Sequence, residues 1–261
     1  MVKFDFRRSV FKIREMAFGS LKDALEKQCD VVYLHSNEAK CSCSSPKGTI
    51  VHKQYTLIND LQLSEEELYK KIGKTCRYEI RRAEKEGCDA IIMTSHNLKC
   101  SLSVIDHFRD TYNDMFGSKG LSHYVFNESL ILSGIDADCV VISFCSMPND
   151  ERLKVYHAYL CDSSNAVLIY SASPLWGEDE KDKTNCIGRM NKFLHWEDIK
   201  WFKAQGFDRY EWGGINSLDS PNGIARFKME FGGEADCFNN YIVPRSLLGL
   251  IYVSLIKYRE R

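Results

Sequence analysis

A lysine between aromatic residues, near the end of the chain, has the side-chain chemistry that acyl transfer or phosphate binding needs. Phe227-Lys228 lies between a loop that contains Pro221 and the glycine pair Gly232-Gly233. An ammonium held beside aromatic rings can face a developing oxyanion or a phosphate. The alternative is a surface lysine whose stem lies along apolar neighbours. We therefore interpret Phe227 and Lys228 as candidate catalytic residues.

Patterns for covalent catalysis and for nucleotide binding are absent from the sequence. It contains no Ser-His-Asp or Cys-His spacing and no G-x-S-x-G, H-E-x-x-H or kinase pattern. The G-x-G-x-x-G and Walker-type loops are missing as well. Direct attack by an amine on an activated acyl group needs only positioning, a proton path and charge stabilisation. That chemistry is compatible with the residues present.

A candidate phosphate site precedes a strongly apolar helix that we predict at residues 189–205. The segment Asn185-Cys186-Ile187-Gly188-Arg189-Met190 is expected to be a loop that opens this helix. Free amides at a helix N-terminus, next to a glycine, bind anions. We therefore expect donor phosphates to contact Asn185, Gly188, Arg189 and Asn191. A loop with glycine also opens many helices that bind nothing, so this alternative stays open.

A second cationic group lies on a helix predicted from Ser64 to Gly87. Ser64-Glu65-Glu66-Glu67 matches a capping box, and Gly73 is expected to weaken or kink the helix. Its exposed face is basic, and Arg77 and Arg81, one turn apart, are candidates for holding phosphates of a donor or acceptor. The alternative is a solvated face with i,i+4 ion pairs.

The elements that would position these residues mix strands with helices. Further helices are predicted at residues 19–28, 101–116, 127–132 and 246–258, and loops at residues 41–48 and 176–184. Strands are predicted at residues 30–35, 49–58, 88–93, 209–215 and 236–243, with an antiparallel meander at residues 139–145, 153–161 and 166–172. This order predicts an α+β fold, with residues 1–60 as a short α/β lead-in and residues 61–261 as the main domain.

Composition favours a reduced cytoplasmic protein. The formal net charge of -1 gives no global attraction to nucleic acid or anionic membrane. The first residues are charged without an apolar run behind them, and no stretch is long enough to span a bilayer. The 11 cysteines are scattered, which is typical of small buried thiols. A metal site using Cys41, Cys43 and His52 is the alternative; we expect no bound metal.

Four segments, taken together and in order, resemble the FemA/FemB/FemX group of peptidoglycan-bridge aminoacyltransferases and related acyltransferases of the GNAT superfamily. They are Tyr78 to Gly87 (YEIRRAEKEG), Leu194-His195-Trp196-Glu197, Tyr210 to Gly214, and Arg226-Phe227-Lys228 followed by Phe231-Gly232-Gly233. The resemblance covers roughly residues 61–234. It implies a GNAT-type fold, with a central mixed, mostly antiparallel twisted sheet and helices on both faces.

The resemblance also implies an N-acyltransferase. An acyl or aminoacyl group would pass from acyl-CoA or aminoacyl-tRNA, as co-substrate, to a primary amine on a cell-envelope or sugar precursor, with no permanent cofactor. By position, Lys228 would stabilise the transferring group. Partners would be a small-molecule, sugar or lipid-linked amine acceptor and tRNA; a homodimer is left open. Residues expected to line the site are Glu211, Gly213, Gly214 and Tyr170.

Departures from the family pattern keep the donor and acceptor open. Bridge-forming enzymes carry two such domains, whereas this chain has about one. Glu211 stands in the stretch where Asp is usual, and Asn185 and Met190 occupy the first and last positions of the coenzyme-A loop, where the family has Gln or Arg and Gly or Ala. The alternative function is a non-catalytic module that binds tRNA or a nucleotide-linked sugar through the basic helix.

Overall fold

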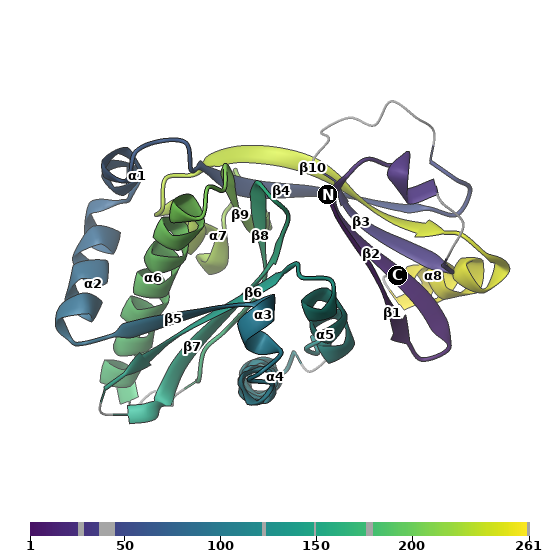
Figure 1. The fold of residues 1–261 in the computed structure, drawn as a ribbon. Coiled ribbons are helices and arrows are strands. Elements are labelled where there is room, and N and C mark those ends of the chain that lie inside the picture. Colours follow the sequence, from purple (N-terminus) through teal and green to yellow (C-terminus); the bar gives the residue numbers. More distant parts are fainter. Residues whose placement is uncertain (26–28, 37–44, 122–123, 149, 176–179, 260–261) are drawn as a thin grey trace.

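One mixed β-sheet joins strands from nearly the whole chain (Figure 1). The computed structural model describes residues 1–25, 29–36, 45–121, 124–148, 150–175 and 180–259. Ten strands in these ranges form the sheet in the order β1-β2-β3-β10-β4-β9-β8-β7-β6-β5. Neighbours pair antiparallel except for β2–β3 and β8–β9, which are parallel. The strands are β1 (Val2–Arg8), β2 (Phe11–Gly19), β3 (Val31–Ser36), β4 (Ile50–Asp60), β5 (Asp89–Thr94), β6 (Val140–Met147), β7 (Asp150–Cys161), β8 (Asn165–Ala172), β9 (Arg209–Ile215) and β10 (Glu234–Pro244).

The α+β class and most predicted strands are confirmed, including the meander, which is β6–β7–β8. The N-terminal hairpin β1–β2 was not predicted, and the expected helix at residues 19–28 is wrong over its described part. Gly19 ends β2, and a single 3-10 turn (Asp23–Leu25) follows. The segment Phe11–Gly19 forms strand β2 because β1 and β3 pair with its two edges. Most of the expected loop at residues 41–48 lies outside the described residues.

Helices cover both faces of the sheet (Figure 1). The capping box at Ser64 is confirmed: Ser64 Oγ accepts from the Glu67 amide, and Glu67 accepts from the Ser64 amide. The expected continuous helix is in fact two, because the chain is extended at Ile72 and the Gly73 amide donates to the Glu230 carbonyl. The helices are α1 (Glu65–Lys71), α2 (Lys74–Lys85), α3 (Ser95–Leu98), α4 (Ser103–Ser118), α5 (Glu128–Asp136), α6 (Lys181–Ala204), α7 (Gly223–Met229) and α8 (Leu247–Arg259).

Two large apolar cores lie on opposite sides of the sheet. On one side, α1, α2, α6 and α7 pack over β9 and the meander, around Trp212 and Phe231, which are fully buried. On the other side, α4 and α5 pack around Phe108 and Tyr156, and α8 packs against β10, β3 and β2. Successive residues of β9 therefore face different environments: Tyr210 and Trp212 face the α6 core, and Glu211 faces the other side, where it contacts His35.

The loop predicted at residues 185–190 is wrong. Helix α6 begins at Lys181, so Asn185 and Gly188 lie inside it and their amides belong to the helical hydrogen-bond ladder. The polar run from Lys181 to Asn185 was mistaken for a loop, because the helix has no side-chain cap at Glu180 to mark its start.

No helix in the described part of the chain is both long and apolar enough to cross a membrane. The cysteines in that part are all free thiols, and most are buried.

Candidate functional site

The sheet opens between β8 and β9, close to residues that the sequence singled out. These parallel strands pair from Asn165↔Arg209 to Val167↔Glu211, and no ladder pair joins them further along. The register of β8 against β7 shifts between Leu168 and Tyr170, which makes Ile169 an extra residue. Such a bulge increases the local twist and bends the strand. Strand β8 therefore diverges from β9 and leaves a gap, the β8–β9 opening, beside Gly213 and Gly214.

Helix α7 places Lys228 at this opening. Asn222 begins the helix, and its side chain accepts a hydrogen bond from the Ala225 amide at 2.9 Å. From the last turn, Lys228 Nζ donates to the carbonyl oxygens of Trp212, at 2.6 Å, and Gly214, at 2.9 Å. The Gly213 carbonyl between them accepts from Thr56 of β4. Lys228 thus binds the β9 carbonyls on the side that β8 has left.

The two glycines of β9 are required by close contacts. Gly213 has φ +65, and a Cβ there would lie 2.6 Å from the carbonyl oxygen of Leu168. A Cβ on Gly214 would lie 2.5 Å from the Gln54 side chain. A larger residue at Gly213 would force β8 and β9 apart at the point where they diverge.

A cavity of about 430 Å³ lies on the far side of the opening from α6. Gly213 and Gly214 form part of its wall, together with Glu15 of β2 and His35 of β3. His35 Nε2 lies 2.9 and 3.1 Å from the two carboxylate oxygens of Glu211, which is only 6% exposed. The opening therefore has an ammonium on one side and two carboxyl groups on the other.

Burial shifts the pKa values of Lys228 and Glu15 toward neutrality. It lowers the pKa of Lys228 from 10.5 to about 8, against the opposing charge of Glu211. It raises the pKa of Glu15 from 4.5 to about 8, although His35 acts in the opposite direction. Burial also lowers the pKa of His35, but the Glu211 carboxylate outweighs it and the net pKa is raised. Shifted acids and bases that converge on a cavity are typical of active sites.

Two of the residues predicted to bind phosphate have other partners, and a third lies within a helix. Arg189 is 9% exposed and forms a bidentate ion pair with Glu86, the C-cap residue of α2, with two nitrogen–oxygen distances of 3.0 Å. The Asn191 side chain lies 2.8 Å from His157 Nε2. Asn185 is exposed but lies within α6. Because Gly188 is helical as well, the structural basis for a phosphate loop here is lost.

The cations of α2 lie at the surface, away from the opening. Arg77 donates to the carbonyls of Tyr69 and Lys70, so it binds the last turn of α1. Arg81 is exposed, and its Nε donates to the Arg77 carbonyl at 3.3 Å. The two arginines are adjacent, as predicted, but they face solvent beside α1.

Of the remaining predicted residues, Phe227 lies near Lys228 and Tyr170 lies in an aromatic cluster. The Phe227 ring packs 5.6 Å from His195 and 5.8 Å from Phe231, centroid to centroid. Tyr170 packs against Tyr112 and Phe126. Its hydroxyl accepts from the Asn127 amide at 3.3 Å, so Tyr170 anchors α5.

A buried hydrogen-bond network joins α6 to the sheet beneath Lys228. Asp198 Oδ2 accepts from Tyr159 at 2.6 Å and lies 2.7 Å from His157 Nδ1. The Tyr159 hydroxyl lies 2.9 Å from that of Tyr210, which lies 2.7 Å from His195 Nδ1. Burial, His157 and the Lys228 charge together hold the pKa of His195 well below its ordinary value.

His157, His195 and Asp198 are the described residues that best match a metal-ligand set, with ligand atoms all within 4.8 Å. Both ring nitrogens of His157 already contact hydrogen-bond partners, as does Nδ1 of His195. The arrangement fits a hydrogen-bonded core better than a metal centre. Cys41 and Cys43, two of the ligands of the alternative metal site, lie outside the described residues.

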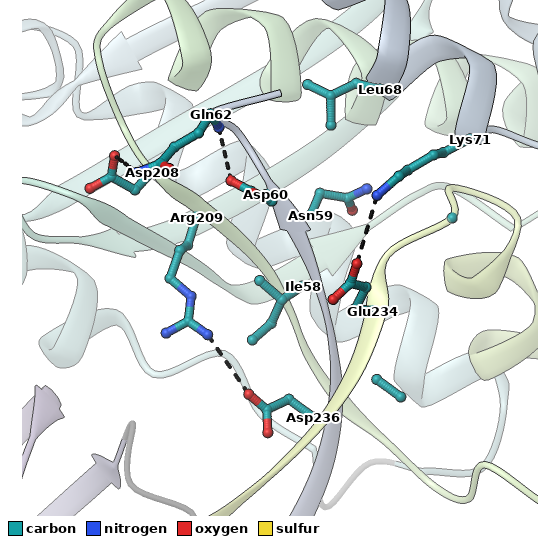
Figure 2. A pocket seen from close by; sticks show the side chains of 12 residues that line it. Ile58, Asn59, Asp60, Gln62, Leu68, Lys71, Asp208, Arg209, Glu234 and Asp236 are labelled. Carbon is teal, nitrogen blue, oxygen red and sulfur yellow. Dashed lines mark hydrogen bonds and ion pairs between the residues drawn. The ribbon is translucent and has the colours of Figure 1, made fainter. Parts of the chain in front are cut away.

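A second hollow, of about 340 Å³, lies between α1 and the ends of β4, β9 and β10 (Figure 2). Its charged side chains pair with one another: Arg209 with Asp236 at 3.7 Å, and Lys71 with Glu234 at 3.8 Å. Gln62 contacts Asp60 and Asp208 across the rim. This mutual pairing makes the hollow a weaker candidate than the β8–β9 opening.

The sequence alone did not indicate Glu15 and His35 as site residues, because they come together only through the parallel pairing of β2 with β3. A local signal did exist for Glu15, which is the polar residue on a strand face that it shares with Ile13 and Ala17, both fully buried.

No family model matches the sequence, and no curated protein matches it either. Solved structures do resemble the fold. FemX aligns with a TM-score of 0.57 at 12% identity, over 96% of this chain and 86% of FemX. The C-terminal domain of a putative lysylphosphatidylglycerol synthetase from Agrobacterium fabrum aligns with a TM-score of 0.54 at 11% identity, over 97% and 83% of the two chains. L-PGS from Bacillus licheniformis aligns with a TM-score of 0.51 at 13% identity, over 96% and 84%. At such identities, the likeness establishes a shared fold alone.

Proposed function

We propose that the protein is an N-acyltransferase of the GNAT type, which moves an acyl or aminoacyl group from an activated donor to a primary amine at the β8–β9 opening. The observation that carries this proposal is the gap itself, with Lys228 on one side and the His35–Glu211 pair on the other. An extended donor can enter such a gap, because the strand edges there have lost their partners in the sheet.

The reaction needs no covalent enzyme intermediate. The amine nitrogen attacks the carbonyl carbon of a thioester or an aminoacyl ester, and negative charge develops on the carbonyl oxygen. The carbon–sulfur or carbon–oxygen bond then breaks, and the thiol or ribose hydroxyl leaves with a proton. The ammonium of Lys228 is placed to stabilise the developing charge, because it is largely desolvated and fixed by two carbonyl contacts.

The likeness of the fold to FemX and to the two synthetase structures supports this class of reaction. The order of sequence segments that resemble the FemA/FemB/FemX group supports it independently. The donor is acyl-CoA or aminoacyl-tRNA, and the acceptor is an amine on a cell-envelope or sugar precursor. Since Arg189 is paired with Glu86, donor phosphates are left to surface cations such as the partly buried Arg77 and the exposed Arg81.

A transfer assay tests this proposal. The full chain is incubated with a panel of primary amines and with either acyl-CoA or charged tRNA, and amide products are identified by mass spectrometry. We expect an amide product with one donor class. If no donor yields product while RNA binds in a salt-sensitive way, the protein is a binding module that uses its basic helix α2.

A further inference from the structure

The cavity behind the β8–β9 opening has a distinctive set of polar groups. Glu15 comes from β2, His35 from β3, Gln54 from β4 and Asn240 from β10. In the sheet, Ala17 pairs with His35, and Asn240 pairs with His35 on its other side. The Glu15 and His35 side chains therefore lie on one face, on neighbouring strands.

Two hydrogen-bond acceptors in this cavity have no partner within the described residues. Asn240 Oδ1 is buried and unpartnered, while the Asn240 amide nitrogen donates to Gln54 Oε1. The Glu15 carboxylate, which is half-buried, accepts no hydrogen bond from the described chain, although His35 influences its charge. A buried acceptor without a donor, such as Asn240 Oδ1, is uncommon, and it is satisfied when a ligand brings an N–H group.

The remaining wall is mainly aliphatic. Leu160 of β7, Val167 and Ile169 of β8, and Ile242 of β10 line the cavity. A ligand that fits this lining has a cationic donor head on an apolar stem, as a primary alkylammonium does.

We propose that this cavity binds the primary ammonium of an alkylamine acceptor and that Glu15 takes its proton as the nitrogen attacks the donor. The proposal rests on the acyl-transfer function proposed above. Asn240 Oδ1 accepts a hydrogen bond from the same ammonium. His35 is a positioning residue: its contact with Glu211 holds the imidazole beside Glu15 and separates the two carboxylates.

The ammonium displaces the proton that Glu15 holds near neutral pH, so that a carboxylate faces a cation. One N–H proton passes from the ammonium to Glu15, which frees the lone pair with which the nitrogen bonds to the carbonyl carbon. The second N–H proton leaves to solvent as the bond to the leaving group breaks with its electron pair on sulfur or oxygen. The leaving thiolate or alkoxide takes a proton from the Lys228 ammonium. Solvent then carries the proton from Glu15 back to Lys228.

The charge of Glu15 sets the expected pH dependence. Because its pKa in the free protein is about 8, alkylamine affinity should rise about tenfold per pH unit from pH 6 to 7 and level off above pH 8. The titratable groups near Glu15 or across the cavity from it are His35, Tyr33, Tyr170, Cys139, Glu211 and His52.

The experiment measures n-hexylamine binding by calorimetry at pH 6, 7 and 8.5, with n-hexanol as the neutral probe. The proteins are wild type, Glu15→Gln, Asn240→Ala and the exposed control Glu65→Gln. We expect the pH dependence in wild type and Glu65→Gln and its loss in Glu15→Gln. Asn240→Ala should keep the dependence but weaken affinity about tenfold, so it tests the site even where Glu15→Gln does not fold.

Turnover separates this proposal from the acyl-transfer function. If wild type makes amide, kcat should fall about 100-fold or more in Glu15→Gln, with the donor KM unchanged. Equal kcat values would overturn the role of Glu15 and leave acyl transfer standing. Absence of product in wild type, with pH-linked amine binding retained, would overturn acyl transfer and keep the ammonium site. Binding that does not depend on pH or on either residue would overturn the site.

Discussion

The partly buried ammonium of Lys228 makes a quantitative prediction about stability. Its pKa is lowered from 10.5 to about 8, so the charged form is disfavoured in the fold by about 3 kcal/mol relative to the unfolded chain. This penalty is complete below pH 8 and disappears as pH rises from 8 to 10.5, because only the unfolded chain still binds the proton there. Lys228→Met removes the titration while it keeps most of the side-chain volume.

The linkage between proton binding by Lys228 and folding gives the size of this pH effect on stability. The stability of wild type relative to Lys228→Met should rise by about 2 kcal/mol between pH 7 and pH 9.5. At pH 7 the variant loses two hydrogen bonds, worth about 1 kcal/mol each, but also loses the charge penalty, so it should remain folded. Urea unfolding of both proteins at the two pH values measures the difference, with exposed Lys22→Met as the control. Parallel pH curves for wild type and Lys228→Met would refute the burial argument.

Three further changes test the packing around the site, and equilibrium unfolding checks each. Asp198→Ala should lower the free energy of unfolding by about 3–5 kcal/mol, because His157 and Tyr159 lose their buried partner; a loss below about 1 kcal/mol would contradict this. Gly213→Ala should cost about 1–3 kcal/mol, since a Cβ at φ +65 meets the Leu168 carbonyl, and an unchanged stability would argue against the close contact. Gly188→Ala should stabilise the protein by about 0.5–1 kcal/mol, because no atom outside its own helix lies within 4 Å of the added Cβ. Destabilisation at Gly188 would instead favour the loop expected from the sequence.

Local patterns were sufficient for most of the fold. The meander β6–β7–β8 could be predicted because its apolar runs are bounded by turn residues, and Asp162 does accept from the amides of Ser164 and Asn165 in one turn. The start of α1 could be predicted for a similar reason, since both halves of a capping box lie within Ser64-Glu65-Glu66-Glu67.

Elements without local markers were missed or misplaced. Strand β1 does alternate, with Val2, Phe4 and Phe6 buried, but its charged residues obscured the pattern. Helix α6 begins in a polar run without a capping side chain, which moved its predicted start beyond Gly188. The continuous helix expected from Ser64 is broken because a tertiary hydrogen bond from Gly73 to Glu230 favours an extended backbone there.

The candidate site was predictable only where neighbours in sequence are neighbours in space. Gly213, Gly214 and Lys228 belong to adjacent segments, and the Lys228 ammonium does contact the Gly214 carbonyl. Arg189 was assigned to phosphate because its pairing with Glu86, about a hundred residues earlier, leaves no trace in the local sequence. Glu15 and His35 approach Glu211 only through the strand order β2-β3-β10-β4-β9, which no single segment encodes.

The most direct test of acyl transfer at the β8–β9 opening is the single-turnover rate of amide formation in Lys228→Met compared with wild type and Lys22→Met. We predict a fall of about 100-fold or more in Lys228→Met and no change in Lys22→Met, because only Lys228 stabilises charge at the opening. Equal rates in all three proteins would contradict the placement of the reaction at this opening.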